Sequence, residues 1–363
     1  MSVTGKDLIV NRAQLDDAAF VESTFPDTPP DGQALLKIGH FALTANNITY
    51  AVAADQLGYW NFFPTEREGF GRIPVWGFAD VVASSAPGVE VGTRVYGYFP
   101  MSTHVMVEPG QIKPHGFMDQ VPHRQPMSPI YNQYSVTGAD PSYAPEREGL
   151  ISLFRPLFTT SFLLDDLHRR EACFGANAVL LSSASSKTAI GLAFLLAQDK
   201  SDGAEIVGLT SPSNMAFVES LGIYDRVVSY DAVSDLAVAP AAFVDMAGNG
   251  DLLRAVHEHY GDALKNSCRV GLTHWQEREL RVDGLPGPRP EFFFAPSYAQ
   301  ERLKEWGNAG FQSRLGKATA DFLDWAAGWV NLREASGPDA VMAAYRDMLA
   351  GSIDPADGVL LQV

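Results

Sequence analysis

The chain has 363 residues, of which 46% are hydrophobic and 19% are charged, and its formal net charge at pH 7 is −16. The length favours two domains, and the composition excludes an intrinsically disordered chain. The negative charge argues against general nucleic-acid binding and against docking on anionic lipid, because both need a basic surface.

The sequence shows neither a disulfide framework nor a targeting segment. Cys173 and Cys268 are its two cysteines, which excludes a disulfide scaffold and a thiolate-rich zinc site. Residues 1–10 include Lys6 and Asp7 and lack the apolar run of a signal peptide. No apolar window reaches the roughly 18 residues of a membrane-spanning helix. We therefore expect a cytoplasmic protein without membrane segments.

In residues 1–150, short runs of β-branched and aromatic residues alternate with Gly and Pro turns. This pattern is typical of a small barrel or a strongly bent sheet. The Pro-rich segment 113–145 contains large apolar residues, so we expect an ordered connection packed between two domains. The predicted strands are 34–38, 75–83, 94–99 and 104–107.

From about residue 154 onward, predicted strands alternate with predicted helices. This order implies βαβ units and a parallel sheet that is covered on both faces. The predicted strands are 178–181, 205–209, 226–229, 242–246, 268–272 and 291–294. The predicted helices are 188–197, 214–221, 252–259, 299–306 and 313–329.

The loop at 182–189 follows a predicted strand and reads Ser-Ser-Ala-Ser-Ser-Lys-Thr-Ala. Ser183, Ser186 and Ala189 keep the spacing of the Rossmann fingerprint G-x-x-G-x-x-G/A, although none of them is glycine. Small residues here let the backbone approach a pyrophosphate at a helix N-terminus, and Lys187 adds a cation. The alternative is a serine-rich N-cap on a core helix. The candidate phosphate contacts are Ser183, Ser185, Ser186, Lys187 and Thr188.

The same loop allows a comparison with a P-loop. Ser186-Lys187-Thr188 resembles the GK[ST] end of that motif, and Phe243-Val244-Asp245 could mimic the strand that carries a Walker B aspartate. However, the first glycine of the motif falls on Leu181, and the loop has no glycine to form a nest of backbone donors. A P-loop-like phosphohydrolase is therefore the weaker alternative.

The end of the strand at 205–209 bears on cofactor preference. An NAD site usually has Asp or Glu here, which binds the ribose 2′-hydroxyl. This chain has Thr210 and Ser211 instead, whose hydroxyls tolerate a 2′-phosphate, so NADP(H) is favoured as the cofactor. The alternative is a Ser-Pro turn that caps the next helix.

Taken in order, these segments resemble the medium-chain dehydrogenase/reductase superfamily, in particular its zinc-free quinone-reductase branch. Residues 91–97, Val-Gly-Thr-Arg-Val-Tyr-Gly, are similar to the family's V-G-D-R-V-x-G turn. Residues 46–50, Asn-Asn-Ile-Thr-Tyr, are similar to its N-P-x-D-Y substrate segment. Residues 291–311 have no counterpart in the family pattern. Weaker similarities lie at 32–38, 73–82, 221–230 and 358–361.

The resemblance implies an α/β fold with a GroES-like, β-rich catalytic domain at 1–150 and a Rossmann NADP-binding domain with a parallel sheet at 151–330. Residues 331–363 would return to the first domain, and the family habit is a homodimer. Tyr230 matches a family tyrosine that contacts the 2′-phosphate. Asn214 replaces a family lysine, which Lys187 could supply from the neighbouring loop. The further candidate cofactor contacts are Gly248 and Leu272.

The resemblance also places candidate substrate residues in the first domain. By the family pattern, Tyr50 is the candidate proton or hydrogen-bond donor, and Asn46 orients the substrate. Tyr59, Trp60 and Phe63 belong to a dense aromatic set that suits a flat conjugated substrate. For each of them alone, core packing is the simpler interpretation.

No metal site is expected. The Cys and His-Glu ligands of the zinc branch are missing from the N-terminal half of the sequence. His257 and His259, two residues apart, would point to different faces of a helix, and we interpret them as part of a solvated helix end.

The predicted function is hydride transfer from NADPH, without a metal, to an activated C=C or C=O of a small quinone- or enone-like substrate. The main alternative is a non-catalytic dinucleotide-binding or sensor protein that keeps the fold without turnover. The third possibility is the P-loop-like phosphohydrolase.

Overall fold

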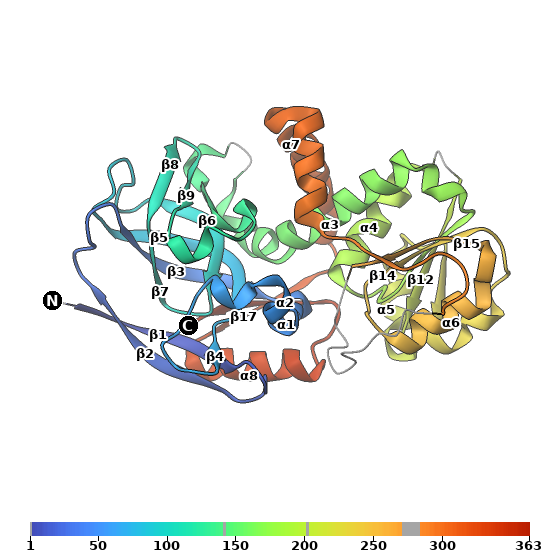
Figure 1. The fold of residues 1–363 in the computed structure, drawn as a ribbon, viewed down its shortest axis with the longest axis horizontal. Coiled ribbons are helices and arrows are strands. Elements are labelled where there is room, and N and C mark those ends of the chain that lie inside the picture. Colours follow the sequence, from blue (N-terminus) through green and yellow to red (C-terminus); the bar gives the residue numbers. More distant parts are fainter. Residues whose placement is uncertain (1, 141–142, 201–202, 271–283) are drawn as a thin grey trace. The chain divides into compact units, whose positions relative to one another are not determined.

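The computed structural model describes residues 2–140, 143–200, 203–270 and 284–363. The described chain forms two compact units, one of Met1–Leu153 with Asn331–Val363 and the other of Phe154–Val330. Figure 1 traces the elements of each unit along the chain. Among the described residues, no helix combines the length and the apolar character needed to cross a membrane.

The first unit is built on two β-sheets. Within the described residues, the larger sheet has nine strands in the order β17-β18-β3-β5-β6-β10-β9-β8, with β7 paired to β3, and the smaller has the order β2-β1-β4. The helices of this unit are α1 (Ala45–Val52), α2 (Ala54–Leu57) and α8 (Pro338–Ala350). The strands are β1 (Ser2–Asn11), β2 (Ala18–Pro26), β3 (Ala34–Leu43), β4 (Phe70–Gly71), β5 (Pro74–Ser84), β6 (Arg94–Pro100), β7 (His104–Val107), β8 (Pro109–Lys113), β9 (Gly116–Asp119), β10 (Gln133–Val136), β17 (Asn331–Ser336) and β18 (Asp357–Gln362).

The central strands of the larger sheet follow the pattern that predicted them. In β6, every side chain after Arg94 is buried, as expected for a strand covered on both faces. Gly97, in the middle of β6, allows a close approach, because a Cβ atom here would lie 2.4 Å from the Tyr134 ring. The four strands predicted in this region are confirmed in β3, β5, β6 and β7.

The turn that carries the V-G-T-R-V motif has a structural role. Arg94 donates from Nε and Nη2 to the two carboxylate oxygens of Glu148, each at 2.6 Å, and from Nη1 to Asp80 at 2.8 Å. Burial would raise the pKa of Glu148, but the Arg94 guanidinium and the Tyr143 hydroxyl hold it below its usual range. A bidentate pair of this kind is strong and directional.

Residues 113–145 are not a connection between domains, so that expectation is wrong. They contribute β9 and β10, and β10 pairs antiparallel with both β6 and β9 inside the nine-stranded sheet. The prolines lie between the strands, where Pro122 and Pro129 each open a short 3₁₀ helix. Proline cannot donate to a strand ladder, which is why the composition of the segment concealed its strands.

The second unit contains a parallel sheet whose described strands have the order β13-β12-β11-β14-β15-β16. In chain order this is 3-2-1-4-5-6, the strand order of Rossmann folds, in which ligands bind where the order reverses beside the first strand. The strands are β11 (Ala178–Leu181), β12 (Glu205–Thr210), β13 (Arg226–Ser229), β14 (Ala241–Asp245), β15 (Leu264–Arg269) and β16 (Glu291–Phe292).

Helices cover both faces of this parallel sheet. Leu252 and Val256 of α6 (Gly250–Tyr260) pack on Phe243 of β14. On the opposite side lie α3 (Glu148–Arg170) and α4 (Lys187–Gln198) (Figure 1). α5 (Met215–Ser220) joins β12 to β13. Of the strand predicted at 268–272, residues 268–269 are the end of β15, and Leu272 lies outside the described residues.

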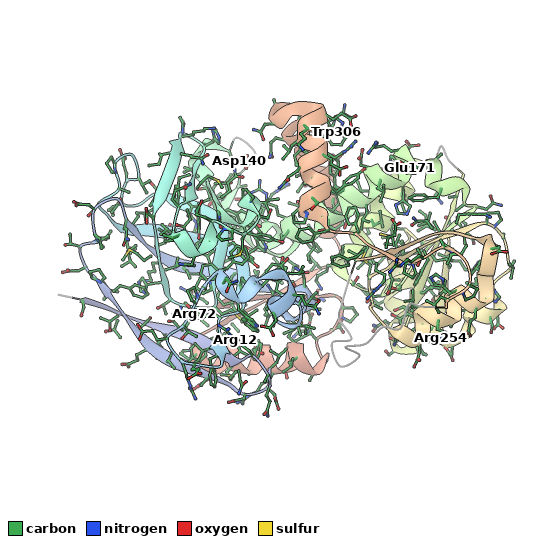
Figure 2. The ribbon with its side chains drawn as sticks, viewed as in Figure 1. Arg12, Arg72, Asp140, Glu171, Arg254 and Trp306 are labelled. Atoms are coloured by element: carbon green, nitrogen blue, oxygen red, sulfur yellow. The ribbon has the colours of Figure 1, made fainter. Side chains whose placement is uncertain are left out.

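The two helices predicted at 299–306 and 313–329 form one element, α7 (Ala295–Ala326). The helix is interrupted at Gly307, whose φ of 69° lies in the left-handed region. Trp306, labelled in Figure 2, packs beside Phe162 and Phe311 with ring centroids 6.2 and 6.1 Å away. This aromatic packing holds α7, on both sides of Gly307, against α3.

Candidate functional site

The loop between β11 and α4 is held by a tyrosine from beyond β13. Ser183 has a left-handed backbone with φ of 49°, a conformation that favours glycine. Its N–H donates to the Tyr230 hydroxyl at 3.2 Å. The family resemblance predicted that Tyr230 contacts a 2′-phosphate. In the structure, Tyr230 stabilises the left-handed backbone of Ser183 by this hydrogen bond. Burial raises the pKa of Tyr230.

Two further side chains fix the shape of this loop. The Tyr224 hydroxyl donates to the Ala184 carbonyl at 2.8 Å. Asn214 Nδ2 donates to Ser185 Oγ at 3.1 Å. Asn214 thus contacts the loop directly instead of presenting the cation that the family pattern has here. The sequence did not identify Tyr224, because nothing local to it indicates a partner 40 residues away.

The N-terminus of α4 begins directly after the loop. Ser186 is its N-cap, and the Ser186 hydroxyl accepts from the Ala189 N–H at 3.3 Å. Lys187 is the first helical residue, and the Thr188 carbonyl accepts from Ser161 Oγ at 2.7 Å. The N-cap interpretation of Ser186 is thus correct. A helix N-terminus also favours anions, so the cap does not exclude a phosphate nearby.

A buried Ser–Asp pair joins the ends of β11 and β14, where the strand order reverses. Ser182 Oγ donates to Asp245 Oδ1 at 2.7 Å and accepts from the N–H groups of Met246 and Ala247 at 2.8 and 3.0 Å. Asp245 Oδ1 also accepts from the N–H of Gly248 at 3.1 Å. Gly248, a candidate cofactor contact, thus belongs to this turn, with φ of 65°.

Asp245 is an unusual carboxylate for its position. Its side chain is fully buried, and Oδ2 has no hydrogen-bond partner among the described residues. Burial raises the pKa of Asp245, although Ser182, the backbone N–H groups and Arg269 oppose this shift. The sequence noted Asp245 only as a possible Walker B aspartate. Asp245 lies at the end of a predicted strand, and Ser182 follows another. Because neighbouring parallel strands end at the same edge of a sheet, this could have predicted that the two side chains meet.

The end of β12 presents hydroxyls and no carboxylate. Thr210 is fully buried, and its Oγ1 has no hydrogen-bond partner in the described part of the chain. Ser211 Oγ lies 2.9 Å from Ser213 Oγ. A buried hydroxyl without a hydrogen-bond partner lowers the stability of the fold, unless a bound ligand supplies the partner. These residues, with the α4 N-terminus, fit a dinucleotide that carries a 2′-phosphate.

In the first unit, α1 is anchored at its start. The side chain of Asn47 accepts from the N–H and the hydroxyl of Thr44 at 2.7 and 3.0 Å, and Asn47 Nδ2 donates to the Pro74 carbonyl at 2.9 Å. Asn46 and Tyr50 lie one turn apart on α1, and the Asn46 side chain opposes the rise that burial causes in the pKa of Tyr50. The helix therefore presents the two candidate catalytic residues together.

Tyr50 belongs to a buried aromatic cluster. Its hydroxyl accepts from Trp76 Nε1 at 3.5 Å, and its ring lies 4.6 Å from that of Tyr59. The Tyr59 hydroxyl is 2.9 Å from that of Tyr131, from a segment that the sequence did not connect with the site. Burial raises the pKa of Tyr50 and of Tyr59.

The other two aromatic candidates pack differently. Trp60 lies under β4, where a Cβ atom on Gly71 would meet its ring at 2.4 Å. The guanidinium of Arg12, labelled in Figure 2, lies 5.8 Å from the Trp60 ring. Among the described ring contacts, Trp60 has none with the Tyr50 cluster, which favours core packing for it. Phe63 lies 4.9 Å from the guanidinium of Arg124, at the edge of the cluster.

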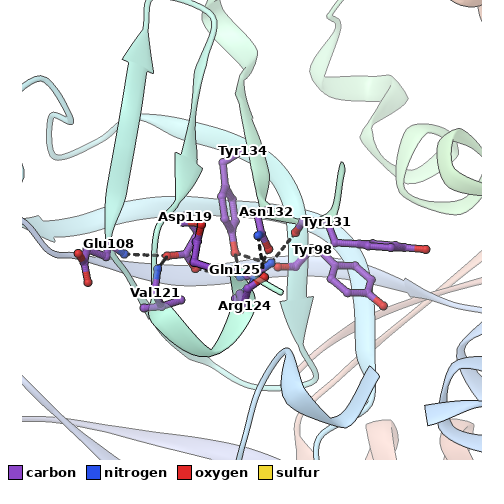
Figure 3. A network of polar contacts seen from close by, with 9 residues as sticks. All are labelled: Tyr98, Glu108, Asp119, Val121, Arg124, Gln125, Tyr131, Asn132 and Tyr134. Atoms are coloured by element: carbon purple, nitrogen blue, oxygen red, sulfur yellow. Dashed lines mark hydrogen bonds and ion pairs between the residues drawn. The ribbon is translucent and has the colours of Figure 1, made fainter. Parts of the chain in front are cut away.

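A buried arginine is the centre of a polar network that includes the backbone of Tyr131, as Figure 3 shows. Arg124 is 1% exposed and donates to Asp119 Oδ2 at 2.9 Å, to Asn132 Oδ1 at 3.0 Å and to the Tyr134 hydroxyl at 3.0 Å. Its Nη2 also donates to the Tyr131 carbonyl. Its charge is therefore paired, and the network fixes the backbone that carries Tyr131.

The paired histidines form no metal site. His257 is fully buried, contrary to the expectation of a solvated helix end. Its Nδ1 donates to the Pro286 carbonyl at 2.8 Å, and its Nε2 pairs with Ser267 Oγ at 2.9 Å. His259 Nε2 donates to the Leu236 carbonyl at 2.8 Å. Within the described ranges, no cluster of three or more His, Cys, Asp or Glu is placed to hold a metal ion.

Comparison with known proteins identifies the family. Residues 41–354 match the family model described as "Protein of unknown function (DUF2855)". The chain belongs to this family. A search of curated proteins finds no match.

Solved structures resemble this chain over almost its whole length. CurA from Vibrio vulnificus in complex with NADPH has a TM-score of 0.59 at 14% identity, over 99% of both chains. A mutant enoyl thioester reductase from Candida tropicalis has a TM-score of 0.57 at 12% identity, over 99% of this chain and 100% of its own. TarJ from S. aureus in complex with NADPH has a TM-score of 0.56 at 11% identity, over 99% and 100%. The predicted fold, a GroES-like β-rich domain plus a Rossmann domain with a parallel sheet, is confirmed.

Proposed function

We propose that this DUF2855 protein is an NADPH-dependent oxidoreductase that transfers hydride, without a metal, to an activated C=C or C=O of a small quinone- or enone-like substrate. The observation that carries the proposal is the 3-2-1-4-5-6 order of the parallel sheet, with the loop after β11 leading into the N-terminus of α4. This arrangement is typical of a dinucleotide site and not of the P-loop alternative.

The second unit supplies the proposed cofactor residues. Ser185, Lys187 and the N-terminus of α4 would hold the pyrophosphate. Thr210 and Ser211 would face the ribose phosphate, since β12 ends without a carboxylate. Four of the similar structures contain NADPH or NADP, which supports the same cofactor here. When bound, the nicotinamide supplies the hydride.

The first unit supplies the proposed substrate residues. Tyr50 is buried, and its raised pKa keeps the phenol protonated at neutral pH, so it can donate to a substrate carbonyl oxygen. Asn46, one turn before Tyr50 on α1, would orient that donor. One of the similar structures is a complex of Etr1p with NADP and crotonyl-CoA, a conjugated thioester, which supports a conjugated acceptor. Metal independence rests on the missing zinc-branch ligands in the sequence.

The non-catalytic alternative is the second candidate, because the fold does not by itself imply turnover. The Ser183 N–H, at a position of the fingerprint, is already bonded to Tyr230, so a dinucleotide would have one backbone donor fewer. A protein that binds the cofactor without turnover is compatible with this geometry.

Two measurements separate the candidates. Thermal unfolding with NADPH, NADH, or ATP with magnesium tests binding, because about 1 mM ligand at about 10 µM affinity adds roughly 2.7 kcal/mol of stability. NADPH absorbance with a panel of quinones and enones then tests turnover. We expect selective stabilisation by NADPH and substrate-dependent oxidation. Stabilisation without oxidation would favour the sensor, and stabilisation by ATP alone would favour the phosphohydrolase.

We also propose a homodimer formed through the parallel sheet. β16 is the last described strand on its side of that sheet, and Phe292 on it is 48% exposed. Light scattering of the purified protein and of Phe292→Asp would test this. A wild-type monomer at micromolar concentration would refute it.

A further inference from the structure

Four phenols gather on one side of the nine-stranded sheet in the first unit. We call Tyr50, Tyr59, Tyr98 and Tyr131 the phenol cluster. Each is at most 8% exposed. The Tyr98 ring lies 4.9 Å from Tyr131 and 5.8 Å from Tyr50, and the Tyr59 ring lies 5.8 Å from Tyr131. They come from α1, a short 3₁₀ helix, β6 and the segment before β10.

The phenol cluster leaves hydroxyl protons without an acceptor among the described residues. Tyr59 and Tyr131 share one bond, which uses one of their two protons. Tyr50 accepts from Trp76, an indole that can only donate. The Tyr98 hydroxyl is buried and has no partner among the described residues. A buried donor without an acceptor costs about 1–3 kcal/mol, and a ligand oxygen would remove this cost.

The surroundings of the phenol cluster keep its own hydroxyls from ionising. Burial raises the pKa of Tyr98 and Tyr131, and the neighbouring phenols raise it further. The hydroxyls therefore stay protonated as donors at neutral pH. The Arg124 guanidinium lies 5.5 Å from the Phe62 ring, which in turn contacts Tyr98 and Tyr131 at 5.2 Å each. The positive charge of Arg124 opposes the rise in the pKa of Tyr98.

We propose that the phenol cluster is an oxyanion site that selects substrates whose reduction produces a phenolate or a conjugated enolate, with Tyr98 and Tyr131 as hydrogen-bond donors beside Tyr50. The inference rests on the proposed function. Hydride from NADPH forms a new C–H bond, a π bond of the conjugated system breaks, and its electron pair ends on the carbonyl oxygen. That oxygen later takes one proton from water. Quinones and cyclic enones fit this pattern, and the aromatic rings provide stacking surfaces for them.

A phenolate that cannot be reduced tests the oxyanion site without turnover. We would titrate 4-nitrophenol into the protein at a pH where the probe is partly ionised, because the phenolate band reports its charge. The methyl ether, 4-nitroanisole, has the same shape without the charge. A charge-assisted hydrogen bond contributes about 1.5–3 kcal/mol, or roughly ten- to hundredfold in affinity. We expect at least about tenfold preference for phenolate over the ether.

The variants Tyr98→Phe and Tyr131→Phe should each weaken phenolate binding about tenfold and leave the affinity for the ether unchanged. Tyr345→Phe is the matched control, since Tyr345 is a buried tyrosine of the same unit whose hydroxyl donates to the Leu15 carbonyl at 2.6 Å. It should alter neither affinity. Circular dichroism and melting temperature show that each variant is folded.

Equal affinity for phenolate and ether, or phenolate binding that neither Tyr98→Phe nor Tyr131→Phe alters, would overturn the oxyanion site. This failure is distinct from failure of the proposed function. Phenolate binding with no oxidation of NADPH would support the site and refute the oxidoreductase. Oxidation of NADPH at the wild-type rate by both Tyr98→Phe and Tyr131→Phe would support the oxidoreductase and refute the oxyanion site.

Discussion

Ser182 Oγ donates to Oδ1 of Asp245 across the ends of two neighbouring parallel strands, at 2.7 Å and with both side chains fully buried. In Rossmann folds, this edge of the sheet is where the ligand crevice opens. The pair therefore fixes the turn after β14 at the place where the cofactor is proposed to bind.

The first prediction concerns the stability that this pair provides. Ser182→Ala removes the donor to Asp245 and the acceptor of the buried Met246 N–H, whereas the Ala247 N–H keeps its bond to Asp245 Oδ1. Because unsatisfied buried groups cost about 1–3 kcal/mol each, we expect the free energy of unfolding to fall by on the order of 3 kcal/mol. Urea unfolding measures this. Ser213→Ala, which removes an exposed hydroxyl, is the control and should change little; equal effects would contradict the role of the pair.

The second prediction concerns pH. Burial raises the pKa of Asp245, so the folded state binds this proton more tightly than the unfolded state, where the pKa is about 3.9. The Asp245 contribution to stability is therefore present at low pH and is lost as the pH rises through the raised value. Asp245→Asn should remove this dependence, so that the variant gains stability relative to wild type as pH rises. Unfolding between about pH 4 and pH 8 tests this, and a constant difference would refute it.

The sequence could predict the elements whose signal is local. The apolar run at Ala178–Leu181 and the Ser-rich loop after it identified β11 and the start of α4 within one residue. The segment 113–145 was misinterpreted because its strands are short and lie between prolines. Their pairing with β6 depends on contacts with residues distant in the chain.

Among the candidate site residues, too, those with a local sequence signal were predicted, and those that depend on contacts between distant segments were not. Tyr50 and Asn46 were identified from a motif within one helix. Tyr131 and Arg124 were not, because their roles arise only when η3 (Pro129–Asn132) folds against Tyr98. Trp60 shows the converse: aromatic density in the sequence suggested a substrate contact, whereas the structure packs its ring under Gly71.

The third prediction concerns the serine that replaces a fingerprint glycine. Ser183 has a φ of 49°, which costs a residue with a side chain about 1–2 kcal/mol, partly offset by the greater unfolded-state freedom of glycine. We expect Ser183→Gly to change stability by less than about 1 kcal/mol and to tighten NADPH binding, because the backbone can approach the pyrophosphate more closely. Ser185→Gly, without a left-handed φ to relieve, should not tighten it. Fluorescence titration measures both, and weaker NADPH binding by Ser183→Gly would count against the fingerprint.

The fourth prediction concerns Lys187 at the start of α4. A cation at a helix N-terminus opposes the helix dipole, and a bound phosphate would offset this cost. Such a contact contributes about 1.5–3 kcal/mol, and Lys187→Ala should therefore weaken NADPH binding roughly tenfold or more while changing the stability of the ligand-free protein less. Lys317→Ala on α7, where the side chain is 80% exposed and paired with Asp321, is the control. If NADPH affinities of wild type and Lys187→Ala agree within about twofold, a difference below 0.5 kcal/mol, Lys187 does not contact the cofactor.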